Sequence, residues 1–217
     1  MLYSRSCARW PPVPRAGLSR DSVVEAAALL ADEVGLSNLT LAALAERLGV
    51  RQPSLYKHLD SLASLHRSIS LLSKRELTGL LTRAAVGRSG ADALHAMAHA
   101  YREWAREHPA RYRASHAMPA DGDVEIEAAS LATVQVIADV LAVYGLEGDD
   151  AIDAIRGFRA MLHGFVSLET EGGFALSASV DRSFDRLVRG YTAALPQWAD
   201  ARDYSATDEP HDAAASH

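Results

Sequence analysis

Residues 39–59 read LTLAALAERLGVRQPSLYKHL, and this stretch decides the fold. Thr40 is a good N-cap for a short helix that ends at Gly49. Pro53 suits the first turn of a second helix, where a missing N–H costs nothing. Two short helices joined by a tight, glycine-containing turn are typical of a helix-turn-helix. The stretch therefore predicts this motif over about residues 40–59.

The second of these helices, over about residues 52–59, is polar on most of its surface. Its two strongly apolar residues, Leu55 and Leu59, lie four apart and share one side. The major groove of DNA accepts an α-helix, and a helix N-terminus favours phosphate. The pattern fits a DNA-contacting helix, although an ordinary solvated helical turn fits a stretch this short equally well. The positions that could meet bases or phosphates hold Arg51, Gln52, Ser54, Tyr56, Lys57 and His58.

Apolar residues recur at helical spacing along the rest of the chain, and neither alternating strand patterns nor internal repeats interrupt them. Alanine and leucine are abundant, whereas β-branched and aromatic residues are sparse. An all-α protein is therefore expected. Besides the helix-turn-helix, helices are predicted over about residues 19–35, 61–83, 91–108, 124–144, 149–169 and 181–195, with a further short helix after Pro109.

The domain organisation follows from breaks in this pattern. Residues 1–17 carry prolines and arginines without periodicity and predict a flexible arm, whose arginines could lie along a DNA minor groove. The glycines of residues 87–90 mark the predicted domain boundary. The expected parts are the arm, a helix-turn-helix domain over 18–64, a connecting helix over 65–86, a ligand-binding and dimerisation domain over 87–196 and a flexible tail over 197–217.

The charge distribution allows nucleic-acid binding without indicating it. Net charge is −6, but residues 1–60 carry 7 Lys and Arg against 6 Asp and Glu, whereas the remainder carries 15 against 22. The single cysteine, Cys7, excludes an internal disulfide framework and a cysteine-based zinc site. No stretch is expected to span a membrane, and residues 1–17 lack the apolar region of a signal peptide. A soluble, cytoplasmic protein is expected.

The helix-turn-helix segment resembles the DNA-binding segment of TetR-type transcriptional regulators. The resemblance rests on the Thr-led helix, the Ala-x-x-Leu-Gly-Val turn, the Pro-Ser-Leu-Tyr start and the following histidine, all in register. It implies base-facing roles for Gln52 and Ser54, and apolar or backbone contacts from Pro53. It implies phosphate contacts from Thr40, Tyr56 and His58, with Lys57 as an addition.

Two positions depart from the family pattern. Arg51 stands where many members have a serine or threonine that caps the recognition helix, which leaves Arg51 available for DNA. Leu62 stands where many have a lysine that reaches phosphate, and leucine cannot replace that contact. These departures weaken the expected DNA affinity and leave the family resemblance intact.

The C-terminal part resembles a subset of the same family. YREWAREHPARYR (101–113) and FRAMLHGFVSLETEGGF (158–174) are similar to the Trp and His-Gly segments of that subset. The resemblance implies a homodimer through the helices at about 149–169 and 181–195, although their apolar stripes could instead face the monomer's own core. A small, mostly apolar effector is expected. Its candidate pocket residues are Met97, Tyr101, Trp104, Tyr112, Met118, Met161, His163 and Phe165, although each taken alone fits a core position better than a ligand contact.

Other functions find less support in the sequence. His95 and His99 lie i, i+4, but no H-E-x-x-H pattern or third ligand at fixed spacing accompanies them, so no metal and no cofactor are predicted. Glu169 and Glu171 near His163 are interpreted as a solvated helix end rather than an acid/base set. A ligand-responsive repressor that binds a double-stranded DNA operator is the leading hypothesis. A helical protein-binding adaptor is the alternative, and an enzyme is less favoured.

Overall fold

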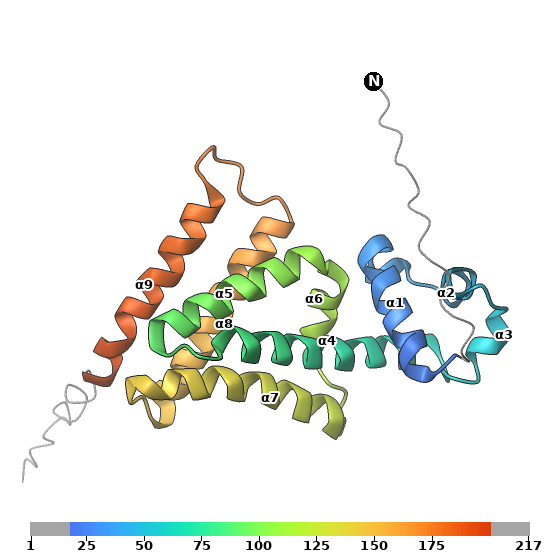
Figure 1. The fold of residues 1–217 in the computed structure, drawn as a ribbon, viewed down its shortest axis with the longest axis horizontal. Coiled ribbons are helices and arrows are strands. Elements are labelled where there is room, and N and C mark those ends of the chain that lie inside the picture. Colours follow the sequence, from blue (N-terminus) through green and yellow to red (C-terminus); the bar gives the residue numbers. More distant parts are fainter. Residues whose placement is uncertain (1–17, 201–217) are drawn as a thin grey trace, which may run out of the picture. The chain divides into compact units, whose positions relative to one another are not determined.

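A computed structural model describes residues 18–200, and all regular structure in that range is helical (Figure 1). The predicted arm (1–17) and residues 201–217 of the predicted tail lie outside the described residues. The elements in chain order are α1 (Arg20–Val34), η1 (Leu36–Asn38), α2 (Leu41–Leu48), α3 (Gln52–Leu55), α4 (Leu62–Ala85), α5 (Gly90–Glu107), α6 (Pro109–Ser115), α7 (Val124–Leu141), η2 (Ala142–Tyr144), α8 (Gly148–Thr170) and α9 (Val180–Asp200). The all-α expectation is confirmed.

The chain divides into two compact units, which meet in sequence between Ile69 and Ser70. The predicted boundary at residues 87–90 therefore falls inside the second unit. The reason is that α4 is shared between the units: Leu65 and Ile69 are buried in its first part, whereas Leu77 and Leu81 belong to the core of the second unit.

Side-chain caps set the helix boundaries of the first unit. Ser19 and Ser22 form a reciprocal capping box at the start of α1, and Ser61 and Ser64 form another at the start of α4. The Thr40 hydroxyl accepts a hydrogen bond of 3.1 Å from the Ala43 N–H at the start of α2. These caps leave little freedom in where each helix begins.

Gly49 makes the tight turn between α2 and α3. Its φ of 67° lies in the left-handed region, and its N–H bonds the carbonyl groups of Ala45 and Glu46. Regular α3 is shorter than predicted, because it ends at Leu55 and residues 56–58 form a turn. In the turn that follows, the His58 and Leu59 N–H groups both bond the Leu55 carbonyl at 2.9 Å.

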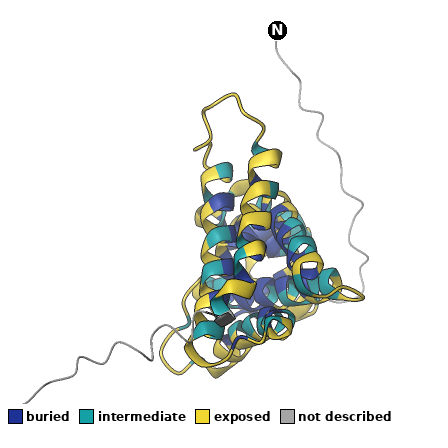
Figure 2. Cartoon of the chain, turned by 90° about the vertical axis from the view of Figure 1, so that its left-hand side faces the viewer, coloured by how far each residue is buried: buried dark blue, intermediate teal, exposed yellow. Residues whose placement is uncertain are grey.

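The second unit is built around one apolar core. Helices α4, α5, α7, α8 and α9 contribute to it, with Phe158 and Phe184 as its largest fully buried side chains. Buried residues lie on the inward sides of the helices, whereas the loop over 171–179 that joins α8 to α9 is exposed throughout (Figure 2). Helix α5 packs against both α8 and α9.

Helix α9 continues through Pro196 to Asp200, beyond the end predicted at Leu195. A proline removes one backbone hydrogen bond, so a helix end was expected there. Core packing outweighs that loss: Leu195 is fully buried, and the Trp198 ring lies against Tyr191 with centroids 6.0 Å apart. The tail boundary predicted at 197 therefore falls inside α9.

Helix α7 and its following turn, Val124–Tyr144, are long and apolar enough to cross a membrane, judged by length and composition alone. The expectation that no stretch would meet this criterion is wrong. In the folded chain α7 packs against α5 and α8, with Ile126, Ile137 and Leu141 buried. The remainder of its surface is largely open to solvent.

Candidate functional site

The predicted DNA-contacting residues form an exposed surface around α3. Arg51, Gln52, Pro53, Tyr56 and Lys57 are exposed, and Ser54 and His58 are half-buried. Leu55 and Leu59 on the other side are buried and seat the segment on the unit. This is the two-sided arrangement that the sequence predicted.

The structure also places Thr40 and Arg51 at helix starts. Thr40 is exposed, and because its oxygen only accepts at the cap, its hydroxyl proton remains available to a phosphate. Arg51 occupies the N-cap position of α3 without a side-chain capping bond. In the first turn Pro53 has no N–H, and the Ser54 N–H bonds the Arg51 carbonyl at 2.8 Å, so DNA contact at this end depends on the side chains.

A partly exposed ion pair joins α1 to α2. Arg47 of α2 donates to Glu33 of α1 at 2.7 Å, and this contact lowers the pKa of the Glu33 carboxyl. Because the pair is partly exposed, it contributes on the order of 1 kcal/mol or less. The buried leucines do most of the positioning.

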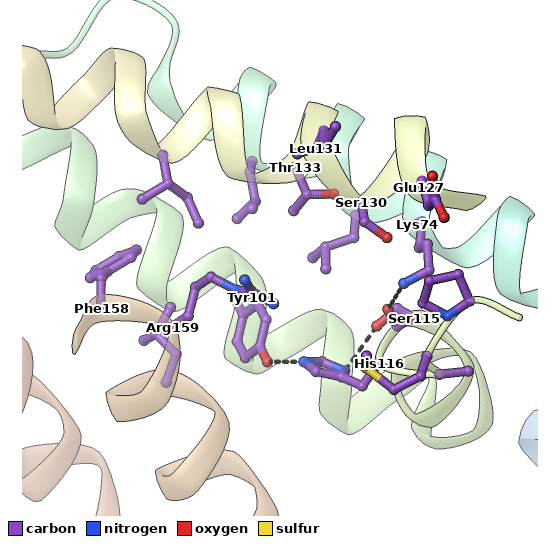
Figure 3. A pocket seen from close by; sticks show the side chains of 17 residues that line it. Lys74, Tyr101, Ser115, His116, Glu127, Ser130, Leu131, Thr133, Phe158 and Arg159 are labelled. Carbon is purple, nitrogen blue, oxygen red and sulfur yellow. Dashed lines mark hydrogen bonds between the residues drawn. The ribbon is translucent and has the colours of Figure 1, made fainter. Parts of the chain in front are cut away.

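The second unit contains a partly open cavity of about 430 Å³ (Figure 3). Its walls come from α4, α5, α7, α8 and the end of α6 with the residues that follow. Leu77, Ile137, Phe158 and Leu162 supply much of the apolar lining. The polar lining includes Lys74, Ser115, His116, Glu127, Ser130 and Arg159. The site is thus more polar than the sequence suggested.

Of the predicted pocket residues, Tyr101 and Met118 line this cavity and the others do not. Met97, Trp104 and Phe165 are buried in the core, and Met161 packs against that core. Tyr112 and His163 do not line the cavity. The Tyr112 hydroxyl and His163 Nδ1 lie 2.6 Å apart. Large apolar residues were predicted to line the pocket, but most of them fill the interior.

His116 lines the cavity and also contacts Tyr112. Its Nδ1 lies 2.9 Å from the Tyr112 carbonyl, which can only accept, so Nδ1 carries the proton. Its Nε2 then accepts from the Tyr101 hydroxyl at 3.1 Å. Both bonds suit a neutral imidazole, and burial lowers the pKa of His116 from 6.5 to about 4. His116 is therefore uncharged at neutral pH.

Acidification should destabilise the second unit through His116. The unfolded chain takes up a proton near pH 6.5, whereas the folded chain resists it until about pH 4, so stability is full above pH 6.5 and declines as pH falls toward 4. The difference corresponds to up to about 3 kcal/mol. We expect His116→Asn to lose less unfolding free energy than wild type between pH 7 and pH 4.5 in urea titrations. Equal losses would contradict this role.

Lys74 and Arg159 bring two cations to the same cavity. Lys74 is buried, donates to the Ser115 carbonyl at 2.7 Å, and has its pKa lowered by burial and by the nearby Arg159 charge. Lys74, Thr133 and Arg159 come from three different helices, so no local sequence pattern could have grouped them.

Comparisons with known proteins agree with this geometry. A family model described as bacterial regulatory proteins, tetR family, matches residues 23–66, and one described as tetracyclin repressor-like, C-terminal domain, matches residues 94–191. An uncharacterised HTH-type transcriptional regulator of Mycobacterium tuberculosis is 43% identical over 158 residues, which cover 72% of each chain. The uncharacterised HTH-type regulator YobS of Bacillus subtilis is 31% identical over 84% of this chain and 95% of its own.

A solved structure shares the fold across both units. A variant of TetR from Acinetobacter baumannii in complex with minocycline has a TM-score of 0.61 and 22% identity, with 83% of this chain and 98% of that chain covered. The narrower subset suggested by the Trp and His-Gly segments stays a prediction. The family predicted from residues 39–59 is confirmed: the chain belongs to the TetR family of HTH-type, DNA-binding transcriptional regulators, and it is a regulator rather than an enzyme.

Proposed function

We propose that this protein is a dimeric repressor that leaves a palindromic operator when a small molecule occupies the cavity of its second unit. Regulators of this family bind DNA operators and small-molecule effectors as dimers and are typically cytoplasmic, the location we propose here. The observation that carries the proposal is the exposed polar surface of α3, seated on the buried Leu55. A protein-binding adaptor would not explain why side chains that can hydrogen-bond DNA bases are exposed on α3.

The DNA contacts divide into two groups. Gln52 can pair with an adenine through two hydrogen bonds, while Ser54 and Arg51 can reach base edges or phosphate. Thr40, Tyr56, Lys57 and His58 supply phosphate contacts, and Pro53 packs against the groove. Two such surfaces about one DNA turn apart, roughly 34 Å, would read the two halves of a palindrome.

The effector is proposed to be a small, mostly apolar molecule with one anionic or acceptor-rich end. Phe158, Leu77 and Ile137 provide apolar contact, while Lys74 and Arg159 favour negative charge. An effector of this kind shifts the dimer between states only as far as its affinities for them differ. The conformation that is released from DNA would be the one that binds the effector more tightly.

The dimer is proposed to form through α8 and α9. The apolar stripes that led to this prediction pack mostly inside the monomer: Phe158, Phe184 and Val188 are fully buried in its own core. The same helices keep other apolar residues exposed, with Ile152 at 43%, Leu168 at 51% and Leu187 at 40% of their surface. No other described atom lies near the Cβ position of Gly164 or Gly190, which leaves room for a partner helix.

Substitutions on the α3 surface test the proposal. We expect Gln52→Ala to weaken binding to the upstream palindrome by roughly 1–3 kcal/mol per half-site, because an adenine contact is lost. Tyr56→Phe should weaken binding to all sequences alike, since it removes a phosphate contact. Fluorescence anisotropy titrations at fixed salt measure both effects.

Arg106→Ala is the matched control, because it removes an exposed arginine from α5 in the second unit. It should leave operator affinity unchanged. If Arg51→Ala, Gln52→Ala and Tyr56→Phe all bound like wild type, the proposed surface would be wrong.

A further inference from the structure

We propose that His95 and His99 of α5 and Asp185 of α9 form a binding site for a divalent transition-metal ion such as Zn²⁺, which joins the two helices. The site shares no residue with the lining of the effector cavity. It goes beyond DNA and effector binding, and beyond the sequence prediction of no metal. The third ligand that the sequence pattern lacked comes from a helix far along the chain.

The three ligand atoms already converge. Successive turns of α5 place His95 and His99 on one face, and the Nε2 atoms of both, with an Asp185 carboxylate oxygen, lie within 4.8 Å of one another. Asp185 Oδ1 is 2.9 Å from His99 Nε2 and 3.9 Å from His95 Nε2. Tetrahedral zinc with bonds of about 2.0–2.1 Å holds its ligand atoms roughly 3.3 Å apart. Small side-chain rotations would complete that geometry.

The two imidazole nitrogens have unmet bonding capacity. Within the described part of the chain, the Nε2 atoms of His95 and His99 are shielded from solvent and have no aligned hydrogen bond, and the nearest carboxylate to His99 Nε2 is that of Asp185, at 2.9 Å. The imidazole rings lie 4.6 Å apart, centroid to centroid, so both nitrogens point into one small region. A buried polar atom without a well-aligned partner is unfavourable, and a shared metal ion would bind the nitrogens of both rings.

Charged groups around the site act on a bound cation in both directions. The carboxylates of Asp185 and Asp92 attract a cation, while the nearby Arg189 opposes it. Imidazole and carboxylate together suit Zn²⁺, Co²⁺ or Ni²⁺.

The site also has an approach from solvent. The side chains of His95, His99 and Asp185 are 32%, 43% and 42% exposed, so the pair of buried nitrogens lies just beneath the surface. A hollow lined by Arg88, Asp92, His95 and Arg189 adjoins it. Three protein ligands leave the fourth position of a tetrahedral ion for water.

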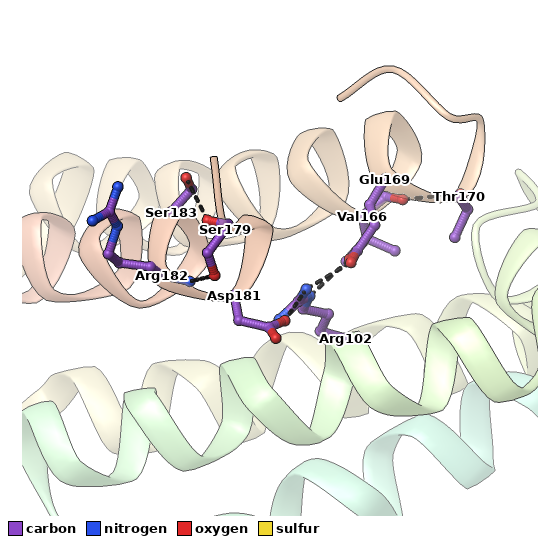
Figure 4. Close-up of polar contacts among 8 residues, drawn as sticks. All are labelled: Arg102, Val166, Glu169, Thr170, Ser179, Asp181, Arg182 and Ser183. Atoms are coloured by element: carbon purple, nitrogen blue, oxygen red, sulfur yellow. Dashed lines mark hydrogen bonds and ion pairs between the residues drawn. The ribbon is translucent and has the colours of Figure 1, made fainter. Parts of the chain in front are cut away.

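A bound ion would reinforce an existing junction between α5 and α9. Arg102 follows His99 by one helical turn and donates to Asp181, which precedes Asp185 by one turn (Figure 4). The His99 and Phe184 rings also meet edge to face at 5.3 Å. Metal binding should therefore raise the melting temperature of the folded chain, because the ion binds the native arrangement.

Calorimetric titration of the untagged, chelator-treated full chain with ZnCl₂ tests the proposal, and CoCl₂ adds a visible-absorption readout. We expect one site-specific ion per chain and a Zn²⁺-dependent rise in melting temperature. His95→Asn, His99→Asn and the near-isosteric Asp185→Asn should each weaken binding by at least about tenfold. His66→Asn is the control: its Nε2 also lacks a partner, but it belongs to no such cluster among the described residues, so binding should persist.

Two results would overturn the site. One is the absence of Zn²⁺ binding to the folded wild-type chain. The other is binding of unchanged affinity and stoichiometry in the His95→Asn, His99→Asn, Asp185→Asn triple variant, which would assign the ion to other groups. Melting curves without metal show whether each variant folds. If the triple variant does not fold, the Asp185→Asn single variant, which keeps the side-chain volume, takes its place in the test.

Discussion

Replacing Leu55 by alanine should lower the unfolding free energy of the first unit by about 3 kcal/mol and abolish operator binding. Leu55 is fully buried and is the residue by which α3 contacts the rest of its unit. A leucine-to-alanine change leaves a cavity that a small unit can fill only in part. Since the first unit has a small core, this loss is a large share of its stability.

Leu29→Ala is the matched control for this experiment, because Leu29 lies on α1 in the same unit and is 38% exposed. It should cost about 1 kcal/mol or less and leave DNA binding intact. Thermal melts and anisotropy titrations of both variants measure the difference. Equal stability losses would contradict the anchoring role of Leu55.

Replacing Arg102 by methionine should cost the second unit about 3–5 kcal/mol of unfolding free energy. Arg102 donates to both Glu169 oxygens at 2.6 and 2.7 Å (Figure 4). Its guanidinium also lies over the Phe184 ring, at 4.8 Å from the centroid. The side chains of Arg102 and Glu169 are 7% and 16% exposed, so removing the cation leaves a nearly buried carboxylate unpaired.

The other arm of this network supplies an internal control. Asp181 receives a 2.8 Å bond from Arg102 but is 80% exposed, so Asp181→Asn should cost about 1 kcal/mol or less. Adding Glu169→Met to Arg102→Met should recover stability, because the unpaired charge disappears. Urea unfolding of the set measures these values. A double variant as unstable as Arg102→Met alone would count against the buried-charge explanation.

The sequence predicted the local chemistry of the first unit well, because its signals are short-range. Caps at Thr40 and Ser61, a left-handed glycine at 49 and a proline at 53 each act within a few residues. The extra length predicted for the α3 helix shows the limit of such signals. Regular α3 ends at Leu55, and the His58 and Leu59 N–H groups both bond the Leu55 carbonyl in the turn that follows.

The second unit was harder to predict because its sites combine distant residues. Helical periodicity identifies buried faces but not which faces surround a void, so Met97 and Trp104 were predicted in the pocket although they fill the core. Glu169 was interpreted as a solvated helix end, yet it pairs with Arg102, while Glu171 is exposed. Lys74 and Arg159 gave no signal as pocket residues, because they belong to α4 and α8 and line one cavity only in the folded unit.

The most direct test of the account is the affinity of the full chain for the palindrome upstream of its own gene, relative to a scrambled duplex of equal length at the same salt. Specific regulators bind their sites typically 10³-fold or more tightly than other DNA. We expect discrimination of about that size by wild type, with the palindrome holding two chains. Equal affinity for both duplexes would contradict the proposed operator-binding function.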